Sequence, residues 1–314
     1  MSRYPEIITV GETSGVTIEE AKKYAGNDTN EMSMVFQFEH VTMEYTNGDK
    51  FTQHPVKLSE WKAIMSKWQT ELNGVAWNSL YLTNHDQPRS VSRWGDDGKY
   101  RKESQKMLYT MLLTMQGTPY VYQGEEIGMT NVKYPSIKDY QDIQIVNAWK
   151  ERVEEGGQDP EAFLRAVEKL GRDNARTPMQ WDTSDQAGFT TGTPWLKVND
   201  NYKEINVKEA LDDPNSIYYY MKKLITLRHE TVVAVYGDFT EYEPENESLY
   251  LYNRSYEGQN LMVILNFTDR EQQFKMPEEI DVKESTLYVS NDENNDTLEN
   301  KTLRPYEAIA YLWK

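Results

Sequence analysis

Short apolar runs alternate with amphipathic segments along the first two-fifths of the chain. Four runs, at 7–11, 34–38, 79–82 and 118–122, have the length and polarity of buried strands. Between them, apolar residues recur at helical spacing, as in the stretch 61–72. Strands that alternate with helices are typical of parallel βα units, and a closed barrel needs eight such units. The pattern therefore predicts an α/β fold with four βα units.

The rest of the chain follows two other patterns. Residues from about 123 to 216 form an excursion that is too long for a plain loop, and its segment 159–171 is predicted to be a helix. From about Val232 onward, short runs of alternating polarity replace the helical spacing. We therefore expect two domains: residues 1–231 carry the βα units and the excursion, and residues 232–314 form a small antiparallel β-sandwich.

The charge balance narrows the range of partners. Thirty-four basic residues against fifty-one acidic ones give a net charge of −17, which disfavours nucleic acid and anionic membranes. The sequence has no cysteine and no run as long as a membrane span, and its first six residues lack the apolar core of a signal peptide. We therefore expect a cytoplasmic protein without disulfides or a cysteine zinc site.

Two polar segments stand at the ends of predicted strands. Glu12 follows the first strand directly, and Asp86 lies in the segment 84–89, Asn-His-Asp-Gln-Pro-Arg, after the third. The carboxyl ends of parallel barrel strands meet at one face, where barrel enzymes carry out catalysis. Two carboxyl groups there suit glycoside cleavage, because one protonates the leaving oxygen while the other stabilises positive charge on the ring.

Other interpretations of these segments compete with catalysis. Glu12 alone is typical of a solvated strand end, and the segment 84–89 is also typical of a loop that satisfies its own polar groups. A metal site is a weaker alternative, because the segment holds a single histidine without a second ligand at a suitable spacing. We therefore expect neither a metal nor another cofactor.

Five segments resemble one enzyme family. The segments 9–13 and 84–89 are similar to the general-acid segment and the Asn-His-Asp segment of glycoside hydrolase family 13, in the family's order. The segments 123–129 and 171–181 resemble its oligo-1,6-glucosidase and dextran glucosidase branch, and the ending at 303–308 extends the resemblance along essentially the whole chain. The resemblance implies an α-glucosidase that cleaves short α-linked gluco-oligosaccharides by a retaining mechanism, with α-1,6 bonds favoured over α-1,4.

The resemblance also implies roles for individual residues. Glu12 would be the general acid and base, and Asp86 would hold the sugar hydroxyls and distort the ring. His85 would donate a hydrogen bond to the same sugar. Arg176 and Arg172 would help to grip the non-reducing glucose. Trehalose-phosphate hydrolase and sucrose isomerase activities stay open as alternatives, and so does a non-catalytic carbohydrate-binding or assembly module with the same fold.

Three details qualify these roles. For either arginine, a structural ion pair with Asp173 or Asp182 is the competing interpretation. The segment 142–144 reads Asp-Ile-Gln where relatives in this branch usually carry an acidic triplet, which leaves the linkage preference open. Four aromatic residues of the second and fourth strands are expected to be core rather than a sugar-stacking wall: Phe36, Phe38, Tyr120 and Tyr122.

The resemblance covers only the C-terminal part of the family's chain. It implies that the four predicted strands are strands 5 to 8 of a (β/α)8 TIM barrel and that the nucleophilic aspartate belongs to a segment upstream of the general acid. The eleven residues before Glu12 do not contain that segment. We therefore expect these 314 residues alone to be inactive. Their exposed strand edges should favour a complementary N-terminal barrel half or self-association.

Overall fold

The structure, a computed structural model, describes residues 6–29, 31–282, 284–293 and 297–314. Among these residues, the four predicted strands form one parallel array. The outer pairs are hydrogen-bonded in parallel register, and a parallel bridge between Val35 and Asn78 joins the pairs in the order β1-β2-β5-β6. The predicted half-barrel is therefore confirmed. Its strands are β1 (Val10–Glu12), β2 (Met34–Phe36), β5 (Ser79–Leu80) and β6 (Thr118–Pro119).

The helix after β1 begins where the sequence places a cap. Glu20 N donates to Thr17 Oγ1 over 3.3 Å, and Thr17 N donates to Glu20 Oε2 over 2.9 Å. This reciprocal capping box satisfies two backbone donors that the helix itself leaves free. The helix, α1 (Ile18–Ala25), ends at Gly26.

Two longer helices carry the apolar stripes that the spacing predicts. α3 (Leu58–Glu71) buries Trp61, Met65 and Trp68 on one face. α5 (Arg101–Thr114) is buried from its fourth residue to its end, because it lies against both the barrel strands and the C-terminal sheet. Shorter elements occupy the connections around these helices: α2 (Glu39–Thr42), β3 (Tyr45–Thr46), β4 (Asp49–Gln53) and α4 (Ser90–Trp94).

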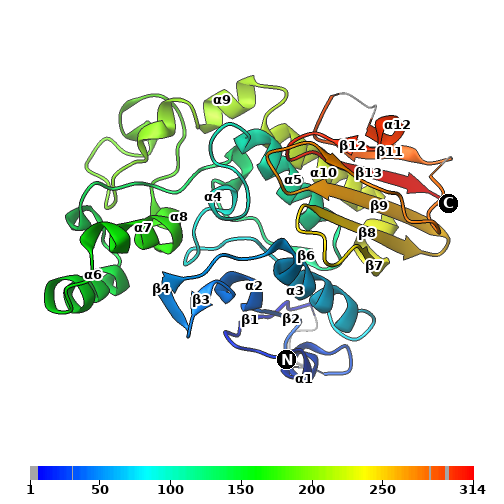
Figure 1. Cartoon of the computed structure of the whole chain (residues 1–314), viewed down its shortest axis with the longest axis horizontal. Coiled ribbons are helices and arrows are strands. Elements are labelled where there is room, and N and C mark those ends of the chain that lie inside the picture. Colours follow the sequence, from blue (N-terminus) through cyan, green and yellow to red (C-terminus); the bar gives the residue numbers. More distant parts are fainter. Residues whose placement is uncertain (1–5, 30, 283, 294–296) are drawn as a thin grey trace.

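The excursion after β6 forms a lobe of its own, at the opposite end of the molecule from the C-terminal sheet (Figure 1). The predicted helix is present as α7 (Pro160–Leu170), where Asp159 Oδ1 accepts from Ala162 N over 2.8 Å. Phe163 of this helix packs on Phe51 of β4, with ring centroids 5.3 Å apart. The lobe also contains α6 (Ile143–Trp149), a π-helix (Lys150–Glu155), α8 (Asp173–Arg176), α9 (Val207–Asp212) and short 3-10 helices.

The segment that follows the lobe differs from the prediction at residues 232–236. α10 (Ile217–Glu230) is the expected final helix, but the residues that follow form α11 (Val232–Tyr236) rather than a strand. Burial of Val233 and Ala234 against the sheet accounts for the difference, because tertiary packing overrides the strand preference of β-branched residues. The first strand of the sheet begins at Asp238. The division into domains at 231 and 232 stays a prediction.

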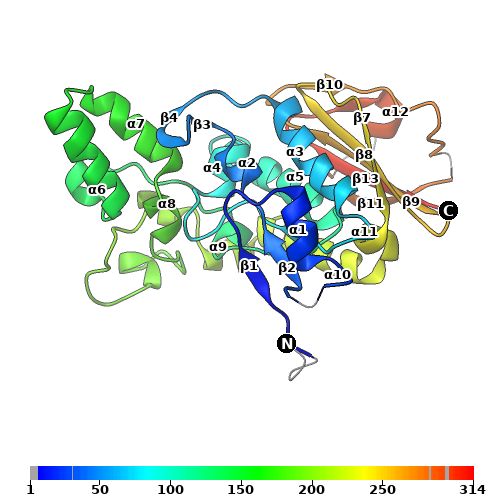
Figure 2. The same ribbon diagram turned by 90° about the horizontal axis from the view of Figure 1, so that it is seen from below.

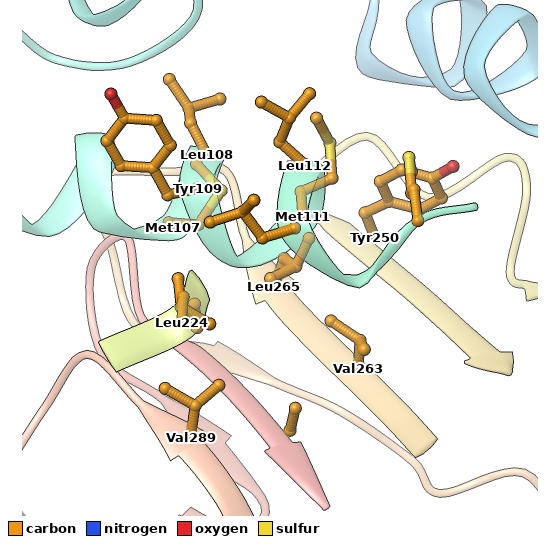
Figure 3. Close-up of a cluster of buried hydrophobic side chains, with 14 of the residues drawn as sticks. Met107, Leu108, Tyr109, Met111, Leu112, Leu224, Tyr250, Val263, Leu265 and Val289 are labelled. Atoms are coloured by element: carbon orange, nitrogen blue, oxygen red, sulfur yellow. The ribbon is translucent and has the colours of Figure 1, made fainter. Parts of the chain in front are cut away.

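The C-terminal sheet is antiparallel, as predicted, in the order β11-β13-β9-β8-β7. One face packs on α5 and α10 through alternate residues such as Val263 and Leu265 (Figure 3). The other face, with Met262 and Ile264, is covered by Phe274 and its neighbours. The strands are β7 (Asp238–Tyr242), β8 (Leu249–Tyr256), β9 (Gln259–Asn266), β11 (Thr286–Ser290) and β13 (Ala308–Trp313), with the separate pair β10 (Gln272–Gln273) and β12 (Thr302–Leu303) and the short helix α12 (Thr297–Asn300).

Candidate active site

Glu12 is the last residue of β1, and its side chain leaves the strand on the exposed side. Gly11 before it is packed so closely that a Cβ there would lie 2.5 Å from Met32 Sδ. Thr13 after it donates from its hydroxyl to the carbonyl of Phe36 over 2.9 Å. The backbone on both sides of Glu12 is therefore fixed to β2, which holds the carboxyl group at the carboxyl end of the parallel strands.

A cavity of about 220 Å³ opens beside Glu12. Asn84 and His85, from the end of β5, line the same cavity. Glu12 and the Asn-His-Asp segment are thus brought together, as the sequence predicts. The rest of the wall is mainly aromatic: Phe36, Phe38, Tyr81, Tyr120 and Tyr122.

The aromatic wall corrects one expectation. Phe36, Phe38, Tyr120 and Tyr122 are only partly buried and border the cavity, so they are not plain core residues. Edge-to-face packing organises them: the ring of Phe36 lies 4.5 Å from that of Tyr120 and 5.1 Å from that of Tyr81. A carboxyl group beside such a wall is suited to a ligand that has an apolar face and hydroxyl groups.

Asp86 lies next to this cavity without lining it. Its carboxylate accepts from Arg176 Nη2 and stands 3.8 Å from Arg172 Nη1. Arg176 also donates through Nε to the carbonyl of His85 over 3.0 Å. The backbone N–H of Asp86 donates to Asn84 Oδ1 over 2.8 Å, which closes the turn. Arg176 therefore holds both His85 and Asp86 in place, and all five predicted site residues fall within one region.

The ion pairs of the two arginines differ from the predicted alternatives. Arg172 donates two hydrogen bonds to Asp142, at 2.8 and 2.5 Å. Asp173 accepts from the backbone N–H groups of residues 141 and 142, and Asp182 accepts from Ser184. Neither of the two predicted partners forms an ion pair with either arginine. Both arginines share Asp86 instead, which places them around a candidate catalytic carboxylate.

Sequence reasoning missed three residues that support this region. Lys50 in β4 reaches the carbonyl of Asp86 with Nζ at 3.5 Å, and burial lowers the pKa of this lysine to about 8. Asp142 joins α6 to Arg172. Arg89, which is 1% exposed, donates to the carbonyls of Gln123, Asn174 and Ala175. No local pattern marks Lys50, whereas the positions of Asp142 and Arg89 inside family-like segments were a usable signal.

Comparison with known proteins shows the family of this chain. Residues 1–237 match the model of the α-amylase catalytic domain. The chain belongs to the α-amylase family. Oligo-1,6-glucosidases of Parageobacillus thermoglucosidasius and Bacillus cereus are 53% and 52% identical to this family member, over 99% and 100% of the chain but 56% of each relative. The crystal structure of trehalose-6-phosphate hydrolase from Bacillus licheniformis matches it with a TM-score of 0.92 and 44% identity, over 98% of the chain and 56% of that protein.

The α-amylase match ends at a structural boundary. The matched residues end one position before β7 begins at Asp238. The chain spans little more than half the length of these relatives. Within the described residues, no helix is long and apolar enough to cross a bilayer, and no group of three or more His, Cys, Asp or Glu could hold a metal ion.

A buried histidine behind the aromatic wall of this α-amylase-family chain predicts acid sensitivity. His40 bonds to Gln37 Nε2 at 2.8 Å and to the carbonyl of Tyr81 at 3.0 Å, and burial, aided by nearby Arg93, lowers its pKa to about 3. The imidazole is then neutral in the folded state but protonates near its ordinary pKa of about 6.5 when unfolded. Protons therefore favour the unfolded state as the pH falls below about 6.5.

This single residue is expected to make the chain about 2 kcal/mol less stable at pH 5 than at pH 7.5. Urea unfolding at the two pH values measures the difference. His40→Gln should reduce that difference, whereas His54→Gln, at an exposed site, should leave it unchanged. Equal pH dependence in the wild type and His40→Gln would contradict the expectation.

Proposed function

We propose that these residues belong to a retaining glycosidase that cleaves short α-glucosides, with α-1,6 bonds favoured over α-1,4. The arrangement that carries the proposal is the position of Glu12 in a cavity shared with Asn84 and His85. In this proposal Glu12 protonates the glycosidic oxygen and later deprotonates the attacking water. Asp86, held by Arg176, orients the sugar by accepting hydrogen bonds from the hydroxyl groups of the sugar.

The names of the relatives favour this substrate class over its rivals. The two relatives at 53% and 52% identity are oligo-1,6-glucosidases, whereas the trehalose-6-phosphate hydrolase of Bacillus subtilis is 43% identical. Gln144, in the segment that departs from the usual acidic triplet, is exposed at the start of α6. We infer that its lost charge weakens contact with the leaving-group sugar.

A retaining mechanism also needs a nucleophile. In retaining glycosidases the two carboxyl groups lie about 5 to 5.5 Å apart. Among the described residues that line the cavity, Glu12 is the one carboxylate. We therefore infer that these 314 residues alone do not form a glycosyl-enzyme intermediate and that the nucleophile comes from an N-terminal half of the barrel.

Exposed apolar residues at the margins of the half-barrel support this partner. Within the described residues β1 pairs only with β2, and it lies at the margin of the molecule (Figure 2). Ile8 is 72% exposed and Ile7 48%, directly before β1, and Val121 after β6 is 38% exposed. Unpaired edges with apolar flanks favour strand addition or self-association. A complementary half would pair with β1 and β6 and cover these residues.

Reconstitution tests the proposal. The chain is assayed with p-nitrophenyl α-glucoside and isomaltose, alone and after coexpression with the N-terminal half of the Parageobacillus thermoglucosidasius enzyme. We expect no turnover by the chain alone, and turnover together with a soluble one-to-one complex when the half is present. The same half with its nucleophilic aspartate changed to asparagine is the matched control and should form the complex without activity.

Two outcomes would contradict the proposal. Hydrolysis by the chain alone would show that the nucleophile lies within it. A stable complex that binds isomaltose but does not cleave either substrate would favour the alternative, a non-catalytic carbohydrate-binding module.

A further inference from the structure

A second and larger cavity, of about 860 Å³, lies away from Glu12 and shares no lining residue with the Glu12 cavity. Part of its wall comes from α5 and the first half of α10, and much of the rest comes from β11 and residues 291–293. Helices of the barrel and the C-terminal sheet thus share it, and ligand sites are frequent where such units meet. We call it the lysine cavity, because Lys102, Lys106 and Lys223 line it.

Lys106 is the buried cation of the lysine cavity. It is 9% exposed, and its ammonium group forms no hydrogen bond and no ion pair among the described residues. Its Nζ atom lies 5.5 Å from the ring centroid of Tyr220. Lys62, the other buried lysine of the described chain, instead donates to three carbonyls at 2.8 to 3.1 Å. Native structures seldom leave a buried charge without such partners, so Lys106 has a property that packing does not explain.

The ammonium group of Lys106 can be reached from the cavity. Lys106 lines the cavity, and its Nζ atom keeps contact with solvent there, unlike Nε1 of Trp61, which is fully enclosed. The other two lysines of the wall are exposed, and Lys102 Nζ donates to Asp213 over 2.6 Å. Lys106 therefore combines a shielded amino group with an open approach, and neither of its two neighbours in the cavity does so.

The charges of the wall determine which molecule suits this amino group. A cation would face the three lysines, and an anion would face four carboxylates: Glu103, Asp213, Asp292 and Glu293. A neutral molecule avoids both conflicts. Burial, aided by nearby Lys102, lowers the pKa of Lys106, although the surrounding carboxylates oppose the effect. The amine that remains after loss of the proton is a nucleophile, and desolvated lysines of this kind form Schiff bases with carbonyl compounds.

We propose that Lys106 is a covalent modification site that forms a Schiff base with small neutral aldehydes entering the lysine cavity. The lone pair of Nζ attacks the carbonyl carbon, and a proton moves from nitrogen to oxygen. The oxygen then leaves as water, and a C=N bond to Nζ forms without any oxidant or reductant. Glu103 and Asp213, whose charges act on Lys106, can relay the protons. That the aldehyde is the open-chain form of a reducing sugar rests on the proposed function, whereas the reactivity of Lys106 does not.

Selective labelling of the full chain tests the proposal. The chain is incubated at pH 7 with a limiting amount of glycolaldehyde and with sodium cyanoborohydride, which reduces each imine to a stable secondary amine. Peptide mass spectrometry then gives the rate of modification at each lysine. We expect Lys106 to react several times faster than the exposed Lys102 and Lys223, because more of its amine is neutral. Lys62 should stay unmodified, because its amino group is held by three carbonyls although burial lowers its pKa too.

Two controls connect the preference to the folded cavity. In urea the lysines should react at similar rates, and Lys106→Arg should remove the fast reaction while Lys102 and Lys223 react as before. Modification of Lys106 at pH 7 no faster than that of the two exposed lysines would overturn the proposal. Protection of Lys106 by inorganic phosphate at constant ionic strength would assign the cavity to an anion and overturn it as well. Preferential labelling that phosphate does not prevent would support it, even if the reconstituted barrel proved inactive.

Discussion

Replacement of Arg228 by leucine is expected to lower the free energy of unfolding by about 4 kcal/mol. Arg228 in α10 is 7% exposed and donates to four carbonyls, those of Leu113, Met115, Gly117 and Ala234, at 2.7 to 3.0 Å. These carbonyls lie where α5 ends, where the chain enters β6 and where α11 turns. Leucine would leave the carbonyls buried without donors, and each unsatisfied group costs about 1 to 3 kcal/mol.

Urea unfolding followed by tryptophan fluorescence and circular dichroism measures this loss. Arg228→Lys should be intermediate, because an ammonium group keeps the charge but not the planar fork of donors. Arg270→Leu is the matched control, since the side chain of Arg270 is 78% exposed and its guanidinium stands 3.8 Å from the carboxylate of the neighbouring Asp269. Its effect should stay within about 0.5 kcal/mol. A loss below about 1 kcal/mol in Arg228→Leu would mean that water or other groups replace the guanidinium.

The parts of the fold that the sequence predicts are those fixed by local rules. The capping box of Thr17 and Glu20 and the Asp159–Pro160 start of α7 are present as expected, because both depend on residues a few positions apart. The four strands were predictable because short apolar runs bounded by polar segments are typical of strands buried between helices. Local pattern and tertiary context agree at these points.

The predictions were wrong at positions whose structure depends on residues far away in the sequence. The segment 232–236 has the composition of a strand, yet it forms a helical turn against a sheet that starts later in the chain. The partners of Arg172 and Arg176 come from positions at least 30 residues away, so spacing along the chain could not identify them. Phe36 in β2 and the aromatic residues that follow β2 and β6 were predicted to be core, because the sequence does not show that they border a cavity.

Glu12→Gln is expected to have the largest effect on activity in the reconstituted barrel. With isomaltose, whose leaving sugar must be protonated, kcat should fall by about 10³-fold, within the range of general acid catalysis. With p-nitrophenyl α-glucoside the leaving group departs without protonation, so the first step should be nearly unchanged. The second step still needs a base to deprotonate water. Stopped-flow measurement should therefore show a burst of nitrophenolate, one per active site, followed by slow turnover.

Glu19→Gln is the matched control, because this glutamate is exposed on α1 and lies outside the cavity. It should retain full activity with both substrates. Equal losses with isomaltose and p-nitrophenyl α-glucoside in the first turnover of Glu12→Gln would show that Glu12 orients the sugar rather than protonating the leaving oxygen. Asp86 and Arg176 would then remain as the charged pair beside the cavity, and the acid would have to come from the N-terminal half.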